Sequence, residues 1–224
     1  MSDYKKEFID FLVKSEALKF GEFTLKSGRK SPYFFSTGNF NTGASIYKLG
    51  YFYASKVAEE KIDFDVIFGP AYKGIPLAVS TAIALAKDFN RDKSYLFDRK
   101  EVKDYADKSA FVGYEPKEKE KVLLIDDVMT TGKTKEEAIE KIKAQFPKVV
   151  FSCLLIAFNR QEVDGEGNNA IEEFEQKFSI PVKAIVTVKE VIDYLHNQEI
   201  EGRVYLDNKT KSRLEDYLKK YGVS

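Results

Sequence analysis

The sequence predicts an α/β fold in which a parallel sheet is flanked by helices on both faces. Short apolar runs alternate along the chain with segments whose apolar residues recur at helical spacing, a pattern typical of β-α-β units. Polar and charged residues directly follow several of these apolar runs. Because ligands of such sheets bind outside the carboxyl ends of the strands, these polar residues are expected to meet at one edge of the sheet.

The N-terminal part of the chain, about residues 1–40, is predicted to form a small accessory element, the hood. Phe8, Phe11 and Leu12 have helical spacing and indicate an amphipathic helix. The segment 20–35 is rich in aromatic residues and contains Gly28. It is therefore expected to form short strands joined by a glycine turn.

The elements of the sheet are expected after the hood. Asn41 and Thr42 can cap a helix, because their side-chain oxygens can accept hydrogen bonds from its first backbone N–H groups. Helical spacing predicts further helices over residues 75–86, after residue 134 and near the C-terminal end. Apolar runs predict strands at residues 66–68, 95–97, 122–125, 149–158 and 182–187.

Length and composition limit the possible classes of function. The 224 residues fit one domain, 1–224, that can bury a sizeable core. Lys plus Arg and Asp plus Glu both number 36, so the net charge is zero and binding to nucleic acid is not expected. The single cysteine, Cys153, excludes an internal disulfide. The N-terminus is charged and no apolar stretch approaches the ~20 residues that cross a bilayer, so we expect a soluble cytoplasmic protein without membrane contact.

The most informative motif spans residues 122–134. An apolar strand leads into Asp126 and Asp127, and then into a hydroxyl-rich turn that contains Gly132. Such a turn directs backbone N–H groups and the positive end of a helix toward one point, where a phosphate can bind. Ionised carboxylates would repel that phosphate, but they accept hydrogen bonds from the vicinal hydroxyls of a ribose. The motif therefore predicts a ribose phosphate site.

The motif has two other interpretations. Gly132, Lys133 and Thr134 match the end of a nucleotide-hydrolysing P-loop, but that pattern requires a glycine where this chain has Asp127. Alternatively, the two aspartates belong to a solvated turn that only caps a helix. The rest of the chain favours the ribose phosphate interpretation.

Five blocks of the sequence, in the same order, resemble the orotate phosphoribosyltransferases of the type I phosphoribosyltransferase fold. The blocks are residues 18–35, 68–76, 99–101, 126–134 and 160–162. The resemblance implies a type I phosphoribosyltransferase-like parallel sheet with an N-terminal hood. It also implies transfer of the 5-phosphoribosyl group from phosphoribosyl pyrophosphate to orotate, yielding orotidine 5'-monophosphate and pyrophosphate in de novo pyrimidine (UMP) biosynthesis. Mg²⁺ is the implied cofactor, held mainly by phosphoribosyl pyrophosphate and water and by no protein ligand directly.

Carried onto this sequence, the resemblance implies three overlapping sets of site residues. The catalytic set is Lys73, Lys103, Asp126 and Asp127. The set that binds phosphoribosyl pyrophosphate is Lys26, Tyr72, Lys73, Arg99, Lys100, Lys103, Tyr105, Asp126, Asp127, Val128, Met129, Thr130, Thr131, Gly132, Lys133 and Thr134. The set that binds orotate is Lys26, Phe34, Phe35, Thr130 and Arg160.

The residue types suit the implied chemistry. Breaking the anomeric C–O bond leaves positive charge on the ribose and negative charge on pyrophosphate, so nearby carboxylates and cations respectively lower the barrier. Arg160 can hold the orotate carboxylate with two parallel hydrogen bonds. The alternatives are that Arg160 forms a surface ion pair and that Phe34 and Phe35 only pack in the core.

The sequence departs from the family in the polar loop expected at about residues 98–113. Tyr105 stands where the family typically has histidine. In the family this mobile loop closes over the active site of the neighbouring subunit, which implies a homodimer in which Lys103 acts in trans. The unperturbed pKa of tyrosine, near ~10, removes a proton donor matched to neutral pH, so slower turnover is expected. A transferase for another base and a non-catalytic phosphoribosyl pyrophosphate sensor remain as alternatives.

Overall fold

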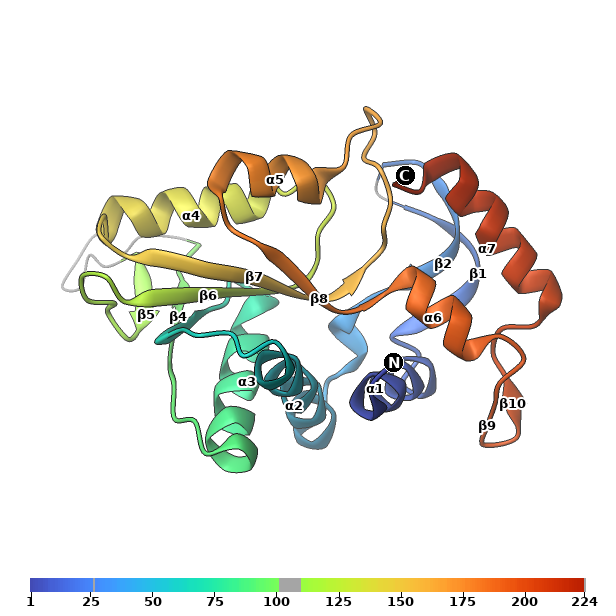
Figure 1. The fold of residues 1–224 in the computed structure, drawn as a ribbon, viewed down its shortest axis with the longest axis horizontal. Coiled ribbons are helices and arrows are strands. Elements are labelled where there is room, and N and C mark those ends of the chain that lie inside the picture. Colours follow the sequence, from blue (N-terminus) through green and yellow to red (C-terminus); the bar gives the residue numbers. More distant parts are fainter. Residues whose placement is uncertain (26, 101–109, 224) are drawn as a thin grey trace.

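A six-stranded sheet forms the centre of the molecule in the computed structural model, which describes residues 1–25, 27–100 and 110–223 (Figure 1). Its strands, in the order β5-β4-β3-β6-β7-β8, run parallel except for β5, which pairs antiparallel with β4. The strands are β3 (Val66–Phe68), β4 (Ser94–Asp98), β5 (Phe111–Gly113), β6 (Lys121–Val128), β7 (Val150–Asn159) and β8 (Val182–Thr187). The predicted parallel sheet is thus confirmed, with an antiparallel strand at one edge.

Helices cover both faces of this sheet (Figure 1). On one face lie α2 (Gly43–Glu59) and α3 (Gly74–Phe89), and on the other lie α4 (Lys133–Gln145) and α5 (Ala170–Phe178). Alternate residues of each strand belong to different cores: Leu123 and Ile125 pack with α2 and α3, whereas Leu124 packs with α4 and α5. Burial on both faces explains why these strands appear in the sequence as continuous apolar runs.

Local sequence signals account for the helix boundaries. Thr42 caps α2 as predicted, and its side chain exchanges hydrogen bonds with Ser45 in a capping box. Thr187 and Glu190 form the same arrangement at α6 (Val188–Leu195). None of the helices in the described ranges is long and apolar enough to cross a membrane.

The hood consists of α1 (Asp3–Lys14), the antiparallel strands β1 (Leu18–Thr24) and β2 (Lys30–Phe35), and the short helix η1 (Thr37–Asn39). The predicted helix and hairpin are both present. The C-terminal helix α7 (Asn208–Tyr221) packs against β2, so both ends of the chain lie on the hood side of the sheet (Figure 1). A two-stranded ribbon of β9 (Glu199–Ile200) and β10 (Arg203–Val204) precedes α7.

The predicted bounds of the loop at residues 98–113 are wrong at both ends. Asp98 is the last residue of β4, and residues 111–113 form β5. Three residues are too few to show an alternating pattern, and the pairing of β5 with β4 is a tertiary contact that the local sequence does not encode. Residues 101–109 lie outside the described residues. The strand predicted at 122–125 also extends further, so that Asp126 and Asp127 belong to β6.

Candidate active site

The carboxyl ends of β3, β4, β6 and β7 lie at one edge of the sheet, and hydrogen bonds join the ends of the first three strands. Asp98, at the end of β4, accepts a 2.7 Å hydrogen bond from the backbone N–H of Ala71, which follows β3. Lys73 from the same turn donates to Asp127 of β6 over 3.1 Å. The polar residues at the ends of β3, β4 and β6 therefore converge as expected, whereas Arg160 after β7 contacts the hood.

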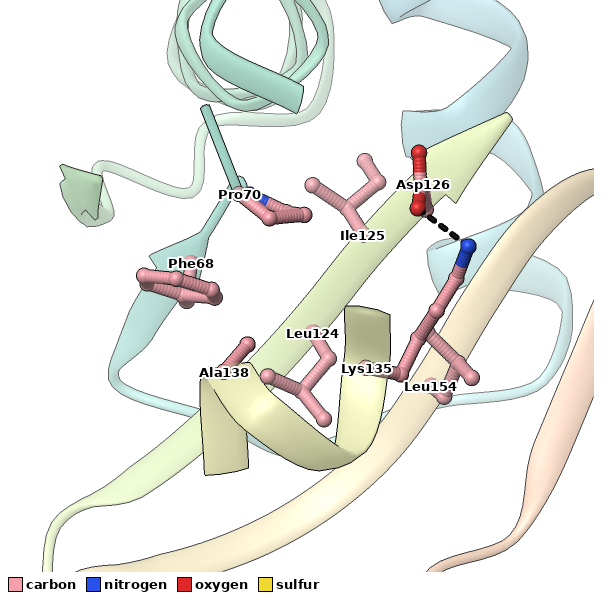
Figure 2. A pocket seen from close by; sticks show the side chains of 8 residues that line it. All are labelled: Phe68, Pro70, Leu124, Ile125, Asp126, Lys135, Ala138 and Leu154. Atoms are coloured by element: carbon pink, nitrogen blue, oxygen red, sulfur yellow. Dashed lines mark ion pairs between the residues drawn. The ribbon is translucent and has the colours of Figure 1, made fainter. Parts of the chain in front are cut away.

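The two aspartates of β6 are both 7% exposed, but they contact different elements. The alternation of the strand directs Asp127 toward α3 and the hood, where its Oδ2 accepts from Lys73 Nζ at 3.1 Å and from Thr37 Oγ1 at 3.2 Å. Asp126 turns toward α4, where its Oδ2 lies 2.5 Å from Lys135 Nζ (Figure 2). The hydroxyl of Tyr53, from α2, holds the end of the strand by donating a 2.7 Å hydrogen bond to the Asp126 carbonyl oxygen.

Burial sets the ionisation of Asp126. Removal from water raises the pKa of its carboxyl group, and the neighbouring carboxylate of Asp127 raises the pKa further. The Lys135 ammonium group opposes both effects, but the pKa remains above its ordinary value. Asp126 therefore depends on Lys135 to carry its negative charge in a buried position.

The turn after β6 is open to an anion. Gly132 has φ +74°, a left-handed backbone conformation that other residues adopt only with strain, so glycine suits the turn into α4. Among the described helices, side chains cap α2, α5, α6 and α7, whereas none caps α1, α3 or α4. The first N–H groups of α4 and the exposed hydroxyls of Thr130 and Thr131 can therefore receive a phosphate.

A second turn, between β3 and α3, carries the predicted Tyr72 and Lys73. Gly69 and Gly74 make this turn tight, since a Cβ on Gly69 would lie 2.1 Å from the Gly74 carbonyl oxygen. The peptide bond between Ala71 and Tyr72 is cis. The side chain of Tyr72 is 72% exposed, and the ammonium group of Lys100 lies 6.0 Å from the centre of its ring.

Arg99 and Lys100 follow β4, as expected. The backbone N–H of Arg99 donates a 2.7 Å hydrogen bond to the Ala110 carbonyl oxygen, which extends the pairing of β4 and β5. Lys141 of α4 pairs with the buried Asp98 at 2.9 Å. Three cationic side chains, those of Lys73, Arg99 and Lys100, thus follow the ends of the two adjacent strands β3 and β4.

Arg160, directly after β7, is part of a buried network. Its Nη2 donates to Glu162 Oε1 at 2.9 Å and to Ser31 Oγ at 3.2 Å, and its guanidinium group lies 4.3 Å from the centre of the Tyr33 ring. Glu162 also accepts hydrogen bonds from the hydroxyls of Tyr33 and Tyr217, the latter at 2.9 Å. Arg160 does form an ion pair, with Glu162, but both side chains are largely buried, so the alternative of a surface ion pair is wrong.

Burial alone would lower the pKa of the Arg160 guanidinium group, but the groups around it have a larger, opposite effect. Tyr33 and the carboxylate of Glu162 raise the pKa above the ordinary value, so Arg160 stays positively charged. The second carboxylate oxygen of Glu162 lies 3.5 Å from Arg29 of the hood. Glu162 therefore joins two arginines, the hood and α7 in one network.

The two phenylalanines of β2 differ in their surroundings. Phe35 is buried and stacks on Phe158 of β7, with ring centres 5.0 Å apart, in agreement with the packing alternative. Phe34 is exposed and contacts Phe23 of β1 at 5.6 Å. Phe34 is thus the aromatic side chain of this pair that a ligand can reach.

Three predicted residues, Lys26, Lys103 and Tyr105, lie outside the described residues. The sequence reasoning missed four side chains that hold the site together, namely Thr37, Asp98, Lys135 and Glu162. Asp98 and Glu162 stood in or beside the blocks already identified, so their positions offered a signal. Thr37 and Lys135 offered none, because a threonine after the hood hairpin and a lysine on a charged helix are ordinary residues.

A sheet edge with paired carboxylates, followed by an open turn and helix, defines the phosphoribosyltransferase class. The phosphoribosyl transferase domain family matches residues 36–184. An orotate phosphoribosyltransferase of Agathobacter rectalis is 47% identical over 225 residues, covering 99% of each chain. One from Methylococcus capsulatus is 46% identical over 225 residues, covering 100% of each.

Solved structures agree with these relatives. The orotate phosphoribosyltransferase of Francisella tularensis superimposes with a TM-score of 0.82 at 39% identity, covering 96% of this chain and 99% of that one. The chain therefore belongs to the orotate phosphoribosyltransferase family, which confirms the predicted family and the type I fold.

Proposed function

We propose that this protein transfers the 5-phosphoribosyl group from phosphoribosyl pyrophosphate to orotate in de novo pyrimidine (UMP) biosynthesis. N1 of orotate replaces pyrophosphate at C1 of the ribose, so the products are orotidine 5'-monophosphate and pyrophosphate. The observation that carries this proposal is the adjacency of two arrangements at one sheet edge. Buried carboxylates at the end of β6 lead into an open turn, and a charged arginine follows β7.

The β6 side suits the phosphoribosyl group. The 5'-phosphate binds the backbone N–H groups and hydroxyls of residues 130–134, with Val128 and Met129 shaping the start of the turn. The carboxylates of Asp126 and Asp127 accept hydrogen bonds from the ribose hydroxyls. As the C–O bond breaks, their negative charge stabilises the positive charge that develops on the ribose ring.

Cations on the β3 and β4 side suit the leaving pyrophosphate. Tyr72, Lys73, Arg99 and Lys100 bind its oxygens, and Lys73 also contacts Asp127, which joins the leaving-group side to the ribose side. Lys103, with Tyr105 nearby, completes this side from the loop of a second subunit in a homodimer. Lys26 is proposed to contact both substrates.

The base site lies between the hood and the end of β7. Arg160 holds the carboxylate of orotate, Phe34 covers the ring, and Phe35 supports this surface from the core. The hydroxyl of Thr130 borders both the base and the phosphate. A pyrimidine acid offers Arg160 a carboxylate to bind, whereas a neutral purine does not.

The cofactor Mg²⁺ fits this arrangement as part of the substrate complex. Within residues 1–25, 27–100 and 110–223, acidic, histidine and cysteine side chains form no group of three that could hold a metal ion. Asp126 and Asp127 are already paired with lysines, so the pyrophosphate and ribose oxygens and water would hold the ion. When bound, it would neutralise charge on the leaving group.

The experiment that tests this function follows base consumption with phosphoribosyl pyrophosphate and Mg²⁺. Orotate is run beside uracil, which lacks the carboxylate, and hypoxanthine, which is a purine. Consumption of orotate alone is the expected result. Consumption of another base would reassign Arg160, and phosphoribosyl pyrophosphate binding without any turnover would identify a sensor.

A further inference from the structure

Lys135 is a buried lysine that the proposed mechanism does not yet use. It is the third residue of α4, and its side chain is 12% exposed. Apolar side chains surround it in the pocket drawn in Figure 2, which is lined by Phe68, Leu124, Ala138 and Leu154 among others. A charged group in such surroundings is strongly destabilising unless it is paired, so the contacts of its ammonium group decide its role.

The ammonium group of Lys135 has two acceptors, both on β6. It lies 2.5 Å from Asp126 Oδ2 and donates to the Val128 carbonyl oxygen over 2.9 Å. The backbone N–H of the same residue donates to the Gly132 carbonyl oxygen over 2.8 Å. The side chain of Lys135 therefore contacts β6 at Asp126 and at Val128, the last residue of the strand, while its backbone contacts the glycine of the turn.

These contacts leave Asp126 with a defined orientation. Its Oδ2 is paired with Lys135, and its Oδ1 accepts a 2.8 Å hydrogen bond from the backbone N–H of Asp127. Both oxygens are thereby fixed before any ribose arrives. Because the cation lies on the α4 side of β6, it acts on Asp126 and on Val128 from the protein side of the site (Figure 2).

We propose that Lys135 is a positioning residue for the ribose phosphate part of the substrate, holding Asp126 and the turn 128–134 in their binding arrangement. This inference rests on the proposed function of the turn. It differs from a contact with substrate, because the ammonium group is occupied by two protein acceptors. It also differs from a purely structural role, because it predicts losses confined to one ligand.

The test compares Lys135→Met with the wild-type protein. Methionine keeps the apolar stem but leaves the Asp126 carboxylate and the Val128 carbonyl without this donor. The KM for phosphoribosyl pyrophosphate is expected to rise about tenfold, while the KM for orotate changes less than about twofold. The matched control is Lys148→Met, which removes a lysine from an exposed pair with Glu118 and should change neither constant.

Ribose 5-phosphate is the direct probe, measured by calorimetry, because it carries the ring hydroxyls and the phosphate but no pyrophosphate. Lys135→Met should lose about tenfold in its affinity, and Lys135→Arg, which keeps the charge, should recover part of that loss. Unchanged affinity for ribose 5-phosphate would overturn the proposal. Equal losses for ribose 5-phosphate and orotate would also overturn it, in favour of a general structural role.

A double variant keeps the proposal testable if Lys135→Met does not fold. Asp126→Asn combined with Lys135→Met leaves neither buried charge without its partner. Because Lys135→Met also removes the donor to the Val128 carbonyl oxygen, this variant should bind ribose 5-phosphate more weakly than Asp126→Asn alone. Equal affinities in the two variants would contradict the assigned role of Lys135 in holding the turn. The ribose 5-phosphate measurements need no base, so they stand even if orotate turns out not to be the acceptor.

Discussion

The ribose phosphate side and the base side of this site are built in different ways. The first is made from one continuous segment, residues 126–135, in which a strand, a turn and the start of a helix contact one another. The second is assembled from distant segments, because Arg160 and Glu162 meet Ser31 and Tyr33 of the hood and Tyr217 of α7.

This difference has consequences for how each side fails. A substitution in the continuous segment disturbs a local arrangement, so it should affect phosphoribosyl binding more than the fold. A substitution in the base network removes contacts between the hood, β7 and α7, so it should lower the free energy of unfolding together with orotate affinity. The following predictions test whether the two sides separate in this way.

Glu162→Ala is expected to have the largest effect. It leaves the buried Arg160 without its carboxylate partner and removes the acceptor of two tyrosine hydroxyls. Loss of one partner of a buried ion pair typically lowers the free energy of unfolding by about 3–5 kcal/mol. Denaturant unfolding measures this change. A control is Glu118→Ala, which breaks the exposed pair with Lys148 and should change the free energy by less than about 1 kcal/mol.

The comparison would fail if Glu162→Ala unfolded like the wild-type protein. Its affinity for ribose 5-phosphate is expected to remain near the wild-type value wherever the variant is folded. A combined loss of ribose 5-phosphate and orotate binding in the folded variant would show that the two sides are not separate.

The pH dependence of ribose 5-phosphate binding tests the continuous segment. Binding requires Asp126 to be ionised, and burial raises the pKa of Asp126, so affinity should be lost on acidification at a higher pH than for a solvated aspartate. The charged groups that act on this carboxyl group are Lys135 from α4 and Asp127 from β6, the latter paired with Lys73.

The sign of the effect of Lys135 follows from its charge. Lys135 lowers the pKa of Asp126, so Lys135→Met should move the acid limb of binding to higher pH. Folding stability depends on pH in the opposite direction from binding affinity. A carboxyl group whose pKa is raised in the folded state stabilises the fold at low pH, and this contribution is lost as the pH rises. Calorimetric titrations across the acid range measure the limb, and an unshifted limb in Lys135→Met would contradict the assignment.

The same comparison explains what the sequence could predict. The motif at 122–134 was recognisable because strand, carboxylates and turn are adjacent in the chain, and the cap at Thr42 because capping is a local interaction. Glu162 could be seen as part of a block, but its contact with Tyr217 joins residues 55 positions apart. No periodicity or spacing indicates such a contact, because it depends on how α7 packs on the hood.

The partner of Lys135 could not be predicted for a different reason. Lys135 is near Asp126 in sequence, but α4 contains four lysines, and the sequence does not indicate which of their side chains reaches β6. That choice depends on side-chain packing against Leu124 and Leu154. The strand β5 was missed because it has only two apolar residues before a glycine, whereas β3, which is equally short, is entirely apolar.

Tyr217→Phe is expected to have the smallest effect and gives the sharpest separation of the two sides. It removes only the hydroxyl that donates to Glu162 Oε2 over 2.9 Å and leaves the packing of the ring against Tyr33 and Tyr221. The free energy of unfolding should fall by about 1 kcal/mol, and the KM for orotate should rise about twofold to fivefold. The KM for phosphoribosyl pyrophosphate should not change, because no contact of Tyr217 within the described residues reaches the segment 126–135.

Steady-state kinetics with each substrate varied in turn separates these constants, and Tyr221→Phe, which keeps the neighbouring ring, is the matched control. Equal changes in both constants would mean that α7 supports the whole site and not the base side alone.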